Sequence, residues 1–280
     1  MRELRLPART PFDGAALLRH FASRAVPGVE EIVDGEYRRS VRLPGGDAVI
    51  GLVPEPDGVR VRVWGEPEGV GSLVDALLDL EADPDAVCDA LGGDPLLGPL
   101  VRAAPGLRVA GCVDGAELAV RAVLGQQVSV AGAATVGGRL AASYGAALAA
   151  PVGGVTRLFP RADALAAADP EALPMPRARA RALVGMCAAI AAGDVDLRRG
   201  ADPDAAEAAL LALPGIGPWT ASYVRLRALG DRDAFPAADL GIRRGLESLG
   251  ADGSPPAALA RAEAWRPLRA YAAQHLWSAQ

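Results

Sequence analysis

The spacing of hydrophobic positions changes along the chain and divides it into two parts. In the first 70 residues, short runs alternate apolar and polar side chains between turns rich in Pro and Gly. These runs are Glu36–Leu43, Ala48–Val53 and Val59–Trp64. Such alternation is typical of antiparallel strands. Residues 13–25 instead follow a helical period. The first part is therefore predicted to combine an antiparallel sheet with a helix.

Helical periodicity takes over after residue 70. Helices are predicted at 70–81 and 84–91, the second with Asp83-Pro84 as its start signal. Further helices are predicted at Asp114–Gly125, Val128–Tyr144, Arg161–Ala168, Arg177–Ala192, Asp204–Ala212, Gly217–Leu229, Leu240–Leu249 and Pro256–Gln280. The Ala-rich residues 145–150 are interpreted as loop or helix-end material. The pattern predicts an α+β fold, with an N-terminal domain over 1–88 and an all-helical domain over 89–280.

Composition excludes several classes of protein. The 280 residues are 51% hydrophobic, which is enough for a substantial core. No apolar run is long enough to span a bilayer, and Met1–Arg9 lacks a signal-peptide core. We therefore expect a cytoplasmic protein with no membrane partner. The three cysteines are isolated and form no Cys-x-x-Cys pair, which argues against zinc or an iron–sulfur cluster.

The charge is unevenly distributed. The net charge of −5 argues at first against a nucleic-acid partner. However, residues 1–105 hold 11 arginines against 18 acidic residues, whereas 106–280 hold 18 against 16. Any single arginine is most simply a solvated side chain on a helix. The grouping of Arg243, Arg244 and several others around residues 213–221 favours phosphate contacts for some of them.

Residues 213–221 read Leu-Pro-Gly-Ile-Gly-Pro-Trp-Thr-Ala and lie between two predicted helices. Gly215 and Gly217 allow a tight backbone hairpin, and Gly217 opens a helix whose first N–H groups have no internal partner. A helix start of this kind binds anions, and a DNA phosphate suits it. The hairpin, with Thr220 in its second helix, is therefore predicted to hold a DNA backbone.

A single carboxylate follows the hairpin. Asp239 lies where an apolar loop leads into the helix predicted from Leu240. Asp is a preferred N-cap, and that role needs no catalysis. A carboxylate at a helix start also stays ionised, which is costly beside DNA phosphates unless it takes part in chemistry. Asp239 can stabilise an oxocarbenium-like sugar or activate water, as carboxylates do in glycoside cleavage.

Aromatic residues are scarce, yet several lie near the hairpin. Trp219 lies inside the motif, Tyr223 follows one helical turn later, and Trp277 lies near the C-terminus. Aromatic faces can stack on a base that has left the duplex, and they bind a cationic alkylated purine especially well. Gln126 and Gln127, at the end of a predicted helix, are candidates to fill the gap left by that nucleotide.

The hairpin and the following Asp239 resemble the helix-hairpin-helix glycosylase superfamily, and within it the AlkA-type 3-methyladenine DNA glycosylases. Supporting stretches include Phe12-Asp13, Gly111-Cys112-Val113-Asp114, Phe235-Pro236 and Trp265-Arg266-Pro267. The resemblance covers nearly the whole chain. It implies a TBP-like N-terminal sheet domain and an all-helical glycosylase domain.

The resemblance also implies roles for particular residues. Asp239 would be the catalytic carboxylate, and Trp219, Tyr223 and Trp277 would line the base pocket. The carbonyls of Leu211, Leu213 and Ile216 would hold a monovalent cation, Na⁺ or K⁺, and no other cofactor is required. Two positions depart from the family pattern. His20 stands where a pocket aromatic is expected, and Gln127 stands where the family has an apolar wedge.

The chain contains no lysine. Enzymes that form a Schiff base with the sugar normally use a lysine amine, and relatives that nick the strand carry one where this chain has Trp219. We therefore expect a monofunctional glycosylase for alkylated purines of the 3-methyladenine and 7-methylguanine type. It would be a monomer that acts on double-stranded DNA in the bacterial nucleoid. Two alternatives stay open: a glycosylase for deaminated or oxidised bases, and a non-catalytic lesion-binding protein.

Overall fold

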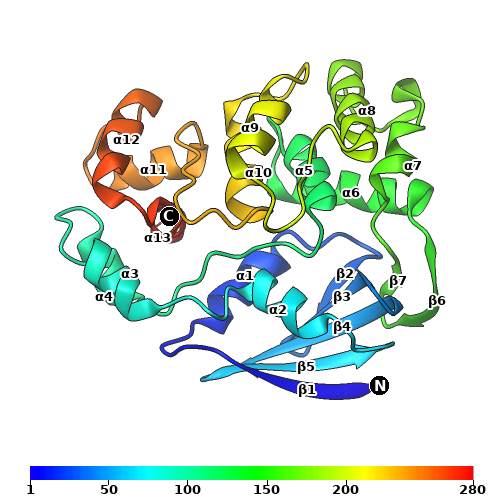
Figure 1. Ribbon diagram of the computed structural model, residues 1–280, viewed down its shortest axis with the longest axis horizontal. Helices are drawn as coiled ribbons and strands as arrows, with labels where there is room; N and C mark the ends of the chain where they lie inside the picture. Colours follow the sequence, from blue (N-terminus) through cyan, green and yellow to red (C-terminus); the bar gives the residue numbers. More distant parts are fainter. Residues whose placement is uncertain (280) are drawn as a thin grey trace.

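A five-stranded antiparallel sheet lies along one side of the molecule and the helices are stacked on the other (Figure 1). The computed structural model describes residues 1–279. The strands are β1 (Arg2–Pro7), β2 (Glu30–Val33), β3 (Glu36–Leu43), β4 (Gly46–Glu55) and β5 (Gly58–Trp64), in the order β1-β5-β4-β3-β2. The helices α1 (Gly14–Ala22) and α2 (Val70–Leu78) pack on the sheet through one buried cluster.

The three predicted strands are confirmed as β3, β4 and β5. The sequence did not indicate β1 and β2, which form the two edges of the sheet. Each edge strand pairs with one neighbour only. Four of the six residues of β1 are exposed, so its pattern carries little hydrophobic signal.

The remaining helices are α3 (Pro84–Leu91), α4 (Gly98–Ala103), α5 (Gly115–Leu124), α6 (Val130–Tyr144), α7 (Ala162–Ala166), α8 (Arg177–Ala192), α9 (Pro203–Leu211), α10 (Pro218–Arg227), α11 (Leu240–Ser248), α12 (Pro255–Ala262) and α13 (Arg269–Ser278). Two short 3₁₀ helices lie at Pro170–Ala172 and Glu263–Trp265. The other predicted helices are found, but the single helix predicted over 256–280 is wrong. It divides at Arg266-Pro267, because a proline cannot continue a helix. Gln280 lies outside the described residues.

The interpretation of residues 145–150 as loop or helix end is also wrong. Ala147–Val152 forms strand β6, which pairs with β7 (Val155–Arg157). This hairpin reaches from the helices down to the sheet (Figure 1). There Leu148 and Val155 pack with Val49 of β4. Contact with the sheet, rather than local propensity, makes this Ala-rich segment extended.

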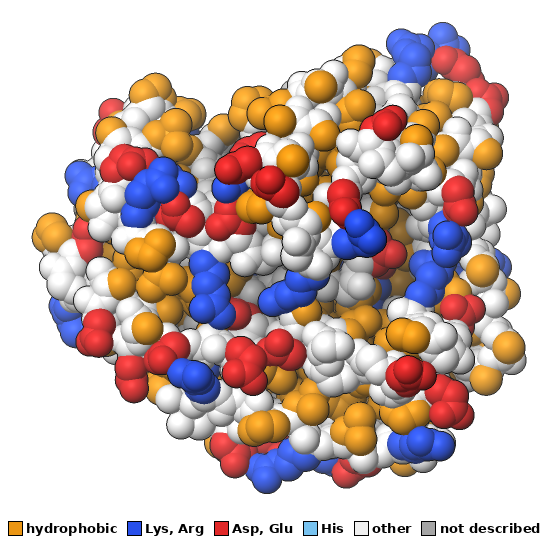
Figure 2. Space-filling model, in the orientation of Figure 1, with side chains coloured by type: hydrophobic (Ala, Val, Ile, Leu, Met, Phe, Trp, Pro, Cys, Tyr) orange, Lys and Arg blue, Asp and Glu red, His pale blue; other side chains and the backbone are white. Residues whose placement is uncertain are grey.

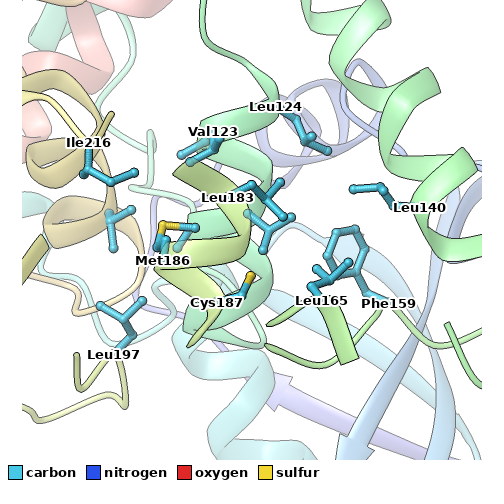
Figure 3. Close-up of a cluster of buried hydrophobic side chains, with 14 of the residues drawn as sticks. Val123, Leu124, Leu140, Phe159, Leu165, Leu183, Met186, Cys187, Leu197 and Ile216 are labelled. Carbon is cyan, nitrogen blue, oxygen red and sulfur yellow. The ribbon is translucent and has the colours of Figure 1, made fainter. Parts of the chain in front are cut away.

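Two hydrophobic clusters organise the helices. One joins α5, α8 and α10, and Figure 3 shows Val123, Leu183, Met186 and Ile216 within it. The other joins α3 and α4 to α11–α13 and surrounds the buried Trp265. The predicted domain boundary at 88/89 falls inside α3, whose Val87 and Leu91 belong to this second cluster. Among residues 1–279, no helix is both long and apolar enough to cross a membrane.

The surface charge is mixed on the face drawn in Figure 2. Basic and acidic side chains alternate there, and neither sign forms a continuous band. Charge on this face therefore does not mark a DNA-binding surface. The candidate functional site is therefore identified from the arrangement of particular side chains rather than from surface charge.

Candidate active site

A cleft of ≈ 1190 Å³ lies where the sheet domain meets the helices. It is lined by residues of α1 and β3 on the sheet side and of α5, α10, α11 and α13 on the helical side. All five residues predicted to form the catalytic centre and base pocket line it: His20, Trp219, Tyr223, Asp239 and Trp277. The fold thus brings together residues that are up to 257 positions apart.

Asp239 is the N-cap of α11, as its position predicted. Its Oδ1 accepts hydrogen bonds from the backbone N–H groups of Gly241 (2.8 Å) and Ile242 (3.2 Å). The same oxygen accepts from Trp277 Nε1 at 2.8 Å, and Oδ2 accepts from Trp219 Nε1 at 2.6 Å. The carboxylate therefore fixes both indoles. Its Oδ2, with one hydrogen bond found, keeps capacity to face a ligand.

The pocket aromatics form a connected group. The rings of Trp219 and Tyr223 stack with centroids 5.4 Å apart and an interplanar angle of 17°. Tyr223 and Trp277 meet edge to face at 6.3 Å. Tyr223 follows Trp219 by one helical turn, and their stacked rings show that the two side chains share a face of α10.

Two arginines beside these rings were not recognised as pocket residues in the sequence. The Arg227 guanidinium lies 4.8 Å from the centroid of Trp277 and 5.3 Å from that of Tyr223. Arg24 lies beside Tyr223 as well, and burial lowers the pKa of Arg24 while the Tyr223 hydroxyl opposes the shift. Arg227 follows Tyr223 by four residues, so helical spacing was a signal that could have revealed it.

His20 stands on the same cleft, half-buried, with its ring edge against Phe21. Burial lowers the pKa of His20 well below its ordinary value, and the positive charges of Arg227, Arg24 and Arg121 lower it further. The ring is therefore neutral at physiological pH, with one donor and one acceptor nitrogen.

The hairpin between α9 and α10 has the geometry that its glycines predict. Gly215 has φ +83°, and a Cβ there would lie 2.6 Å from the Cβ of Ala182. Ile216 anchors the turn in the core (Figure 3). Gly217 is the N-cap of α10 and has no side chain to cap it, and no atom lies within 4 Å of a Cβ built there. This helix start is open to an approaching anion.

The two glutamines after α5 have different surroundings. Gln126 donates from Nε2 to Thr220 Oγ1 (3.0 Å) and to the carbonyl of Gly215 (3.3 Å), so it ties the end of α5 to the hairpin. Thr220 is itself buried. Gln127 is exposed and has φ +57°, a conformation that strains a non-Gly residue. Of the two glutamines, Gln127 is the one whose side chain is exposed at the cleft.

Exposed apolar side chains also line the cleft and were missed in the sequence. Val128 is 43% exposed and Leu240, directly after Asp239, is 55% exposed. Water-exposed side chains of this kind beside a pocket are typical of a contact surface. Their signal in the sequence was weak, because each follows a polar residue in a predicted loop or cap.

The hairpin residues Gly215, Gly217 and Thr220 line the pocket, whereas the predicted phosphate-binding arginines and the cation ligands lie outside it. Arg243 and Arg244 are exposed on α11, and Arg243 pairs with Glu247 at 2.7 Å. The predicted cation ligands bracket the hairpin: Leu211 ends α9, and Leu213 and Ile216 lie in the turn. The carbonyl of Leu213 accepts from the Ile216 N–H at 3.2 Å and keeps a second lone pair.

A buried ionic group, here called the junction cluster, joins the sheet domain to α5. It consists of Glu30, Arg39, Glu117 and Arg121. Arg39 pairs with Glu30 (3.1 Å) and Glu117 (2.8 Å), and Arg121 pairs with the same two carboxylates at 2.9 and 3.0 Å. The Tyr37 hydroxyl donates to Glu30 at 2.6 Å. Its two positive and two negative charges balance within the cluster.

Comparison with known families gives two matches. Residues 3–114 match the AlkA N-terminal domain, and residues 120–270 match the HhH-GPD superfamily base excision DNA repair protein family. Together these matches account for most of the chain. Most residues that line the cleft belong to one of the two matched segments, and Gln274 and Trp277 lie beyond the second.

Curated relatives give the same picture. The chain is 46% identical over 279 residues to a probable bifunctional transcriptional activator/DNA repair enzyme AlkA of Mycobacterium tuberculosis, covering 98% of this chain and 56% of that protein. It therefore spans about half the length of that relative. It is 37% identical to DNA-3-methyladenine glycosylase 2 of Escherichia coli, covering 95% of this chain and 94% of that protein.

Solved structures share the fold. A 3-methyladenine DNA-glycosylase from Archaeoglobus fulgidus superposes with a TM-score of 0.81 at 23% identity, covering 98% of this chain and 97% of that chain. The structure of MBOgg1 with a low affinity DNA ligand gives a TM-score of 0.79 at 22% identity, with coverage of 100% and 98%. At this level of identity the likeness establishes the architecture only.

Proposed function

The chain belongs to the HhH-GPD superfamily of base excision DNA repair proteins, and from this we propose that it hydrolyses the N-glycosidic bond of alkylated purines in duplex DNA. One observation carries the proposal: the Asp239 carboxylate lies in a cleft beside stacked aromatics and holds two of their indoles. A protein that only binds lesions would need the aromatic residues but not the carboxylate. The carboxylate that faces into the cleft has a clear use in breaking a glycosidic bond.

The residues divide the work by position. The open start of α10 at Gly217 binds a backbone phosphate, and exposed Arg243 and Arg244 add positive charge on α11. The damaged nucleotide leaves the stack, and exposed Gln127 with its neighbour Val128 fills the gap. Gln127 is more polar than an apolar wedge, and Val128 beside it adds apolar contact surface.

Asp239 then acts on the sugar. As the bond from C1′ to the base breaks, positive charge develops on the sugar. Oδ2 of Asp239 faces the cleft with the fewer hydrogen bonds, so it is the oxygen assigned to stabilise this charge and orient water. A base alkylated at N3 or N7 already carries positive charge and leaves as a neutral molecule. It therefore needs little acid assistance.

The absence of lysine supports a monofunctional enzyme. Trp219 donates to Asp239, and no lysine occurs anywhere in the sequence to attack C1′. The expected product is an intact strand with an abasic site. Cleavage of that strand by the purified protein would contradict this part of the proposal.

We propose that the hairpin binds a monovalent cation. The carbonyls of Leu211, Leu213 and Ile216 are oxygen donors of the type that hard cations prefer, and the open start of α10 lies beside them. A bound Na⁺ or K⁺ would attract the DNA phosphate electrostatically. These carbonyls would hold it, and the step at the sugar does not depend on it.

The proposal is tested with duplexes that each carry one lesion: 3-methyladenine, 7-methylguanine, hypoxanthine or 8-oxoguanine. Release of the methylated bases above the spontaneous rate is expected. Tight binding without release would favour the lesion-binding alternative. Release restricted to 8-oxoguanine or hypoxanthine would favour the alternative of a glycosylase for oxidised or deaminated bases.

A further inference from the structure

Among residues 1–279, two arginines in the cleft form no ion pair with a carboxylate. Arg227 is 3% exposed, and its Nη1 donates to the carbonyl of Ala110 at 2.6 Å. Its Nε is buried and has no hydrogen-bond partner. Arg24 donates from Nη1 to the carbonyl of His20 (3.3 Å) and to Ser23 Oγ (2.8 Å). Every hydrogen bond found for this cationic pair, Arg24 and Arg227, goes to a neutral oxygen.

Such burial is expensive without a counter-charge, so the missing partner calls for an explanation. The junction cluster does not supply it, because Glu30 and Glu117 are already shared between Arg39 and Arg121. Asp239 does not pair with either arginine, because its hydrogen bonds go to two indoles and two backbone N–H groups. An anion that is present only during the reaction would complete the balance.

The location of Arg227 indicates which anion. Its guanidinium lies against the rings of Tyr223 and Trp277, which form the proposed base pocket. In the complex with a flipped-out nucleotide, the group next to Arg227 is therefore the base rather than the sugar. We propose that Arg227, supported by Arg24, is a specificity-determining residue that allows release of uncharged purines by stabilising the negative charge such a base acquires as it leaves. This inference rests on the proposed glycosylase function.

The movement of charge during cleavage of the glycosidic bond supports separate roles for Asp239 and the cationic pair. When the bond from C1′ to N9 breaks, its electron pair stays with the base. An uncharged purine thus becomes an anion, while the sugar becomes cationic. Water adds its oxygen to C1′ and its released proton goes to the base. Asp239 serves the sugar, and the cationic pair serves the base.

A cationic methylated base behaves differently. It is repelled by Arg227 when it binds, and it leaves as a neutral molecule that gains nothing from a positive charge. Arg227 also occupies part of the π surface on which such a base would otherwise stack. The pair therefore shifts the preference of the pocket from cationic bases toward uncharged ones.

The test compares two lesions in the Arg227→Gln variant. Gln removes the charge and keeps an N–H donor. Release is followed at enzyme concentrations below saturation, from duplexes with hypoxanthine (uncharged) and with 7-methylguanine (cationic). We expect the ratio of hypoxanthine release to 7-methylguanine release to fall by about 10²-fold. Arg227→Lys, which keeps the charge, should recover much of the hypoxanthine activity.

A second variant covers the case in which Arg227→Gln does not fold. Arg24→Gln changes a half-buried side chain, and it should lower the same ratio by a smaller factor. Arg225→Gln, on the same helix but paired with three carboxylates, is the matched control and should leave the ratio unchanged. Circular dichroism checks that each variant is folded.

Several results would overturn the inference. Equal loss for both lesions, with weaker DNA binding, would mean that Arg227 contacts a phosphate. An unchanged ratio in Arg227→Gln and Arg24→Gln would remove any role in specificity. A wild-type protein that releases 7-methylguanine but no uncharged purine would also contradict it. If the wild type releases no base at all, the proposed function itself fails, which is a separate outcome.

Discussion

The junction cluster and the cationic pair line the same cleft, yet their charges are treated in opposite ways. In the junction cluster, Arg39 and Arg121 each meet two carboxylates, and the charges cancel. In the cationic pair, the hydrogen bonds found for Arg24 and Arg227 go to carbonyl and hydroxyl oxygens rather than to carboxylates. The same cleft thus contains arginines that are paired with carboxylates and arginines that are not. The difference separates ions that hold two domains together from ions that await a ligand.

The largest expected effect concerns the single carboxylate on the reacting side. Asp239→Asn should lower base release by about 10³-fold, because the amide cannot stabilise positive charge on the sugar. Asn is also a good N-cap, so α11 should remain folded. Release is measured from a duplex with 7-methylguanine, and DNA binding is measured separately.

Asp114→Asn provides the matched control. Asp114 caps α5 through the N–H groups of Ala116 and Glu117, and it does not line the cleft. It should release base at the wild-type rate. Near-normal release by Asp239→Asn would show that this carboxylate only caps α11 and orients the indoles.

Disrupting the junction cluster should affect stability rather than chemistry. Glu117→Gln leaves Arg39 buried with one carboxylate in place of two, and we expect a loss of about 3 kcal/mol in the free energy of unfolding. Urea denaturation measures it. Glu247→Gln, which breaks the exposed pair with Arg243, should change stability little. Equal losses in both variants would show that burial adds nothing to the cluster.

The junction cluster should also respond to acid. Burial alone would raise the pKa of Glu30, but the charges of Arg121 and Arg39 outweigh it and hold the pKa below its ordinary value. The unfolded chain therefore binds a proton before the folded one does. Stability from Glu30 is complete above about pH 4.5 and is lost as the pH falls through the lowered value. Urea denaturation between pH 7 and pH 3 should give a shallower decline for Glu30→Gln than for the wild type; equal slopes would contradict this.

The smallest effect tests the cationic pair by its influence on a neighbour. Burial lowers the pKa of His20, and Arg227 and Arg24 lower it further. In Arg227→Gln, the pKa of His20 should therefore move up toward its ordinary value, as followed by NMR titration of the ring. The chain has only one other histidine, His275, whose pKa burial alone lowers to about 4. His275 is thus an internal reference, and an unmoved His20 would mean that the charge of Arg227 is already compensated.

The sequence predicts those parts of the fold and of the site that depend on residues close together in the chain. Alternation identified the three central strands, and spacing of four residues placed Trp219 and Tyr223 on one face. The edge strands β1 and β2 were missed because they bury few side chains. Residues 145–150 were misread because their extended form depends on contact with the sheet.

The sequence by itself determined the elements of the site: a Gly-x-Gly hairpin, an N-cap carboxylate and two aromatics one turn apart. Backbone geometry and side-chain direction follow from neighbours in the chain, so these features are encoded locally. Only the tertiary structure decided that Asp239 holds Trp277 as well as Trp219. It also decided which arginines find carboxylates and which do not. Burial and counter-charge depend on segments far apart in the sequence, and no local pattern records them.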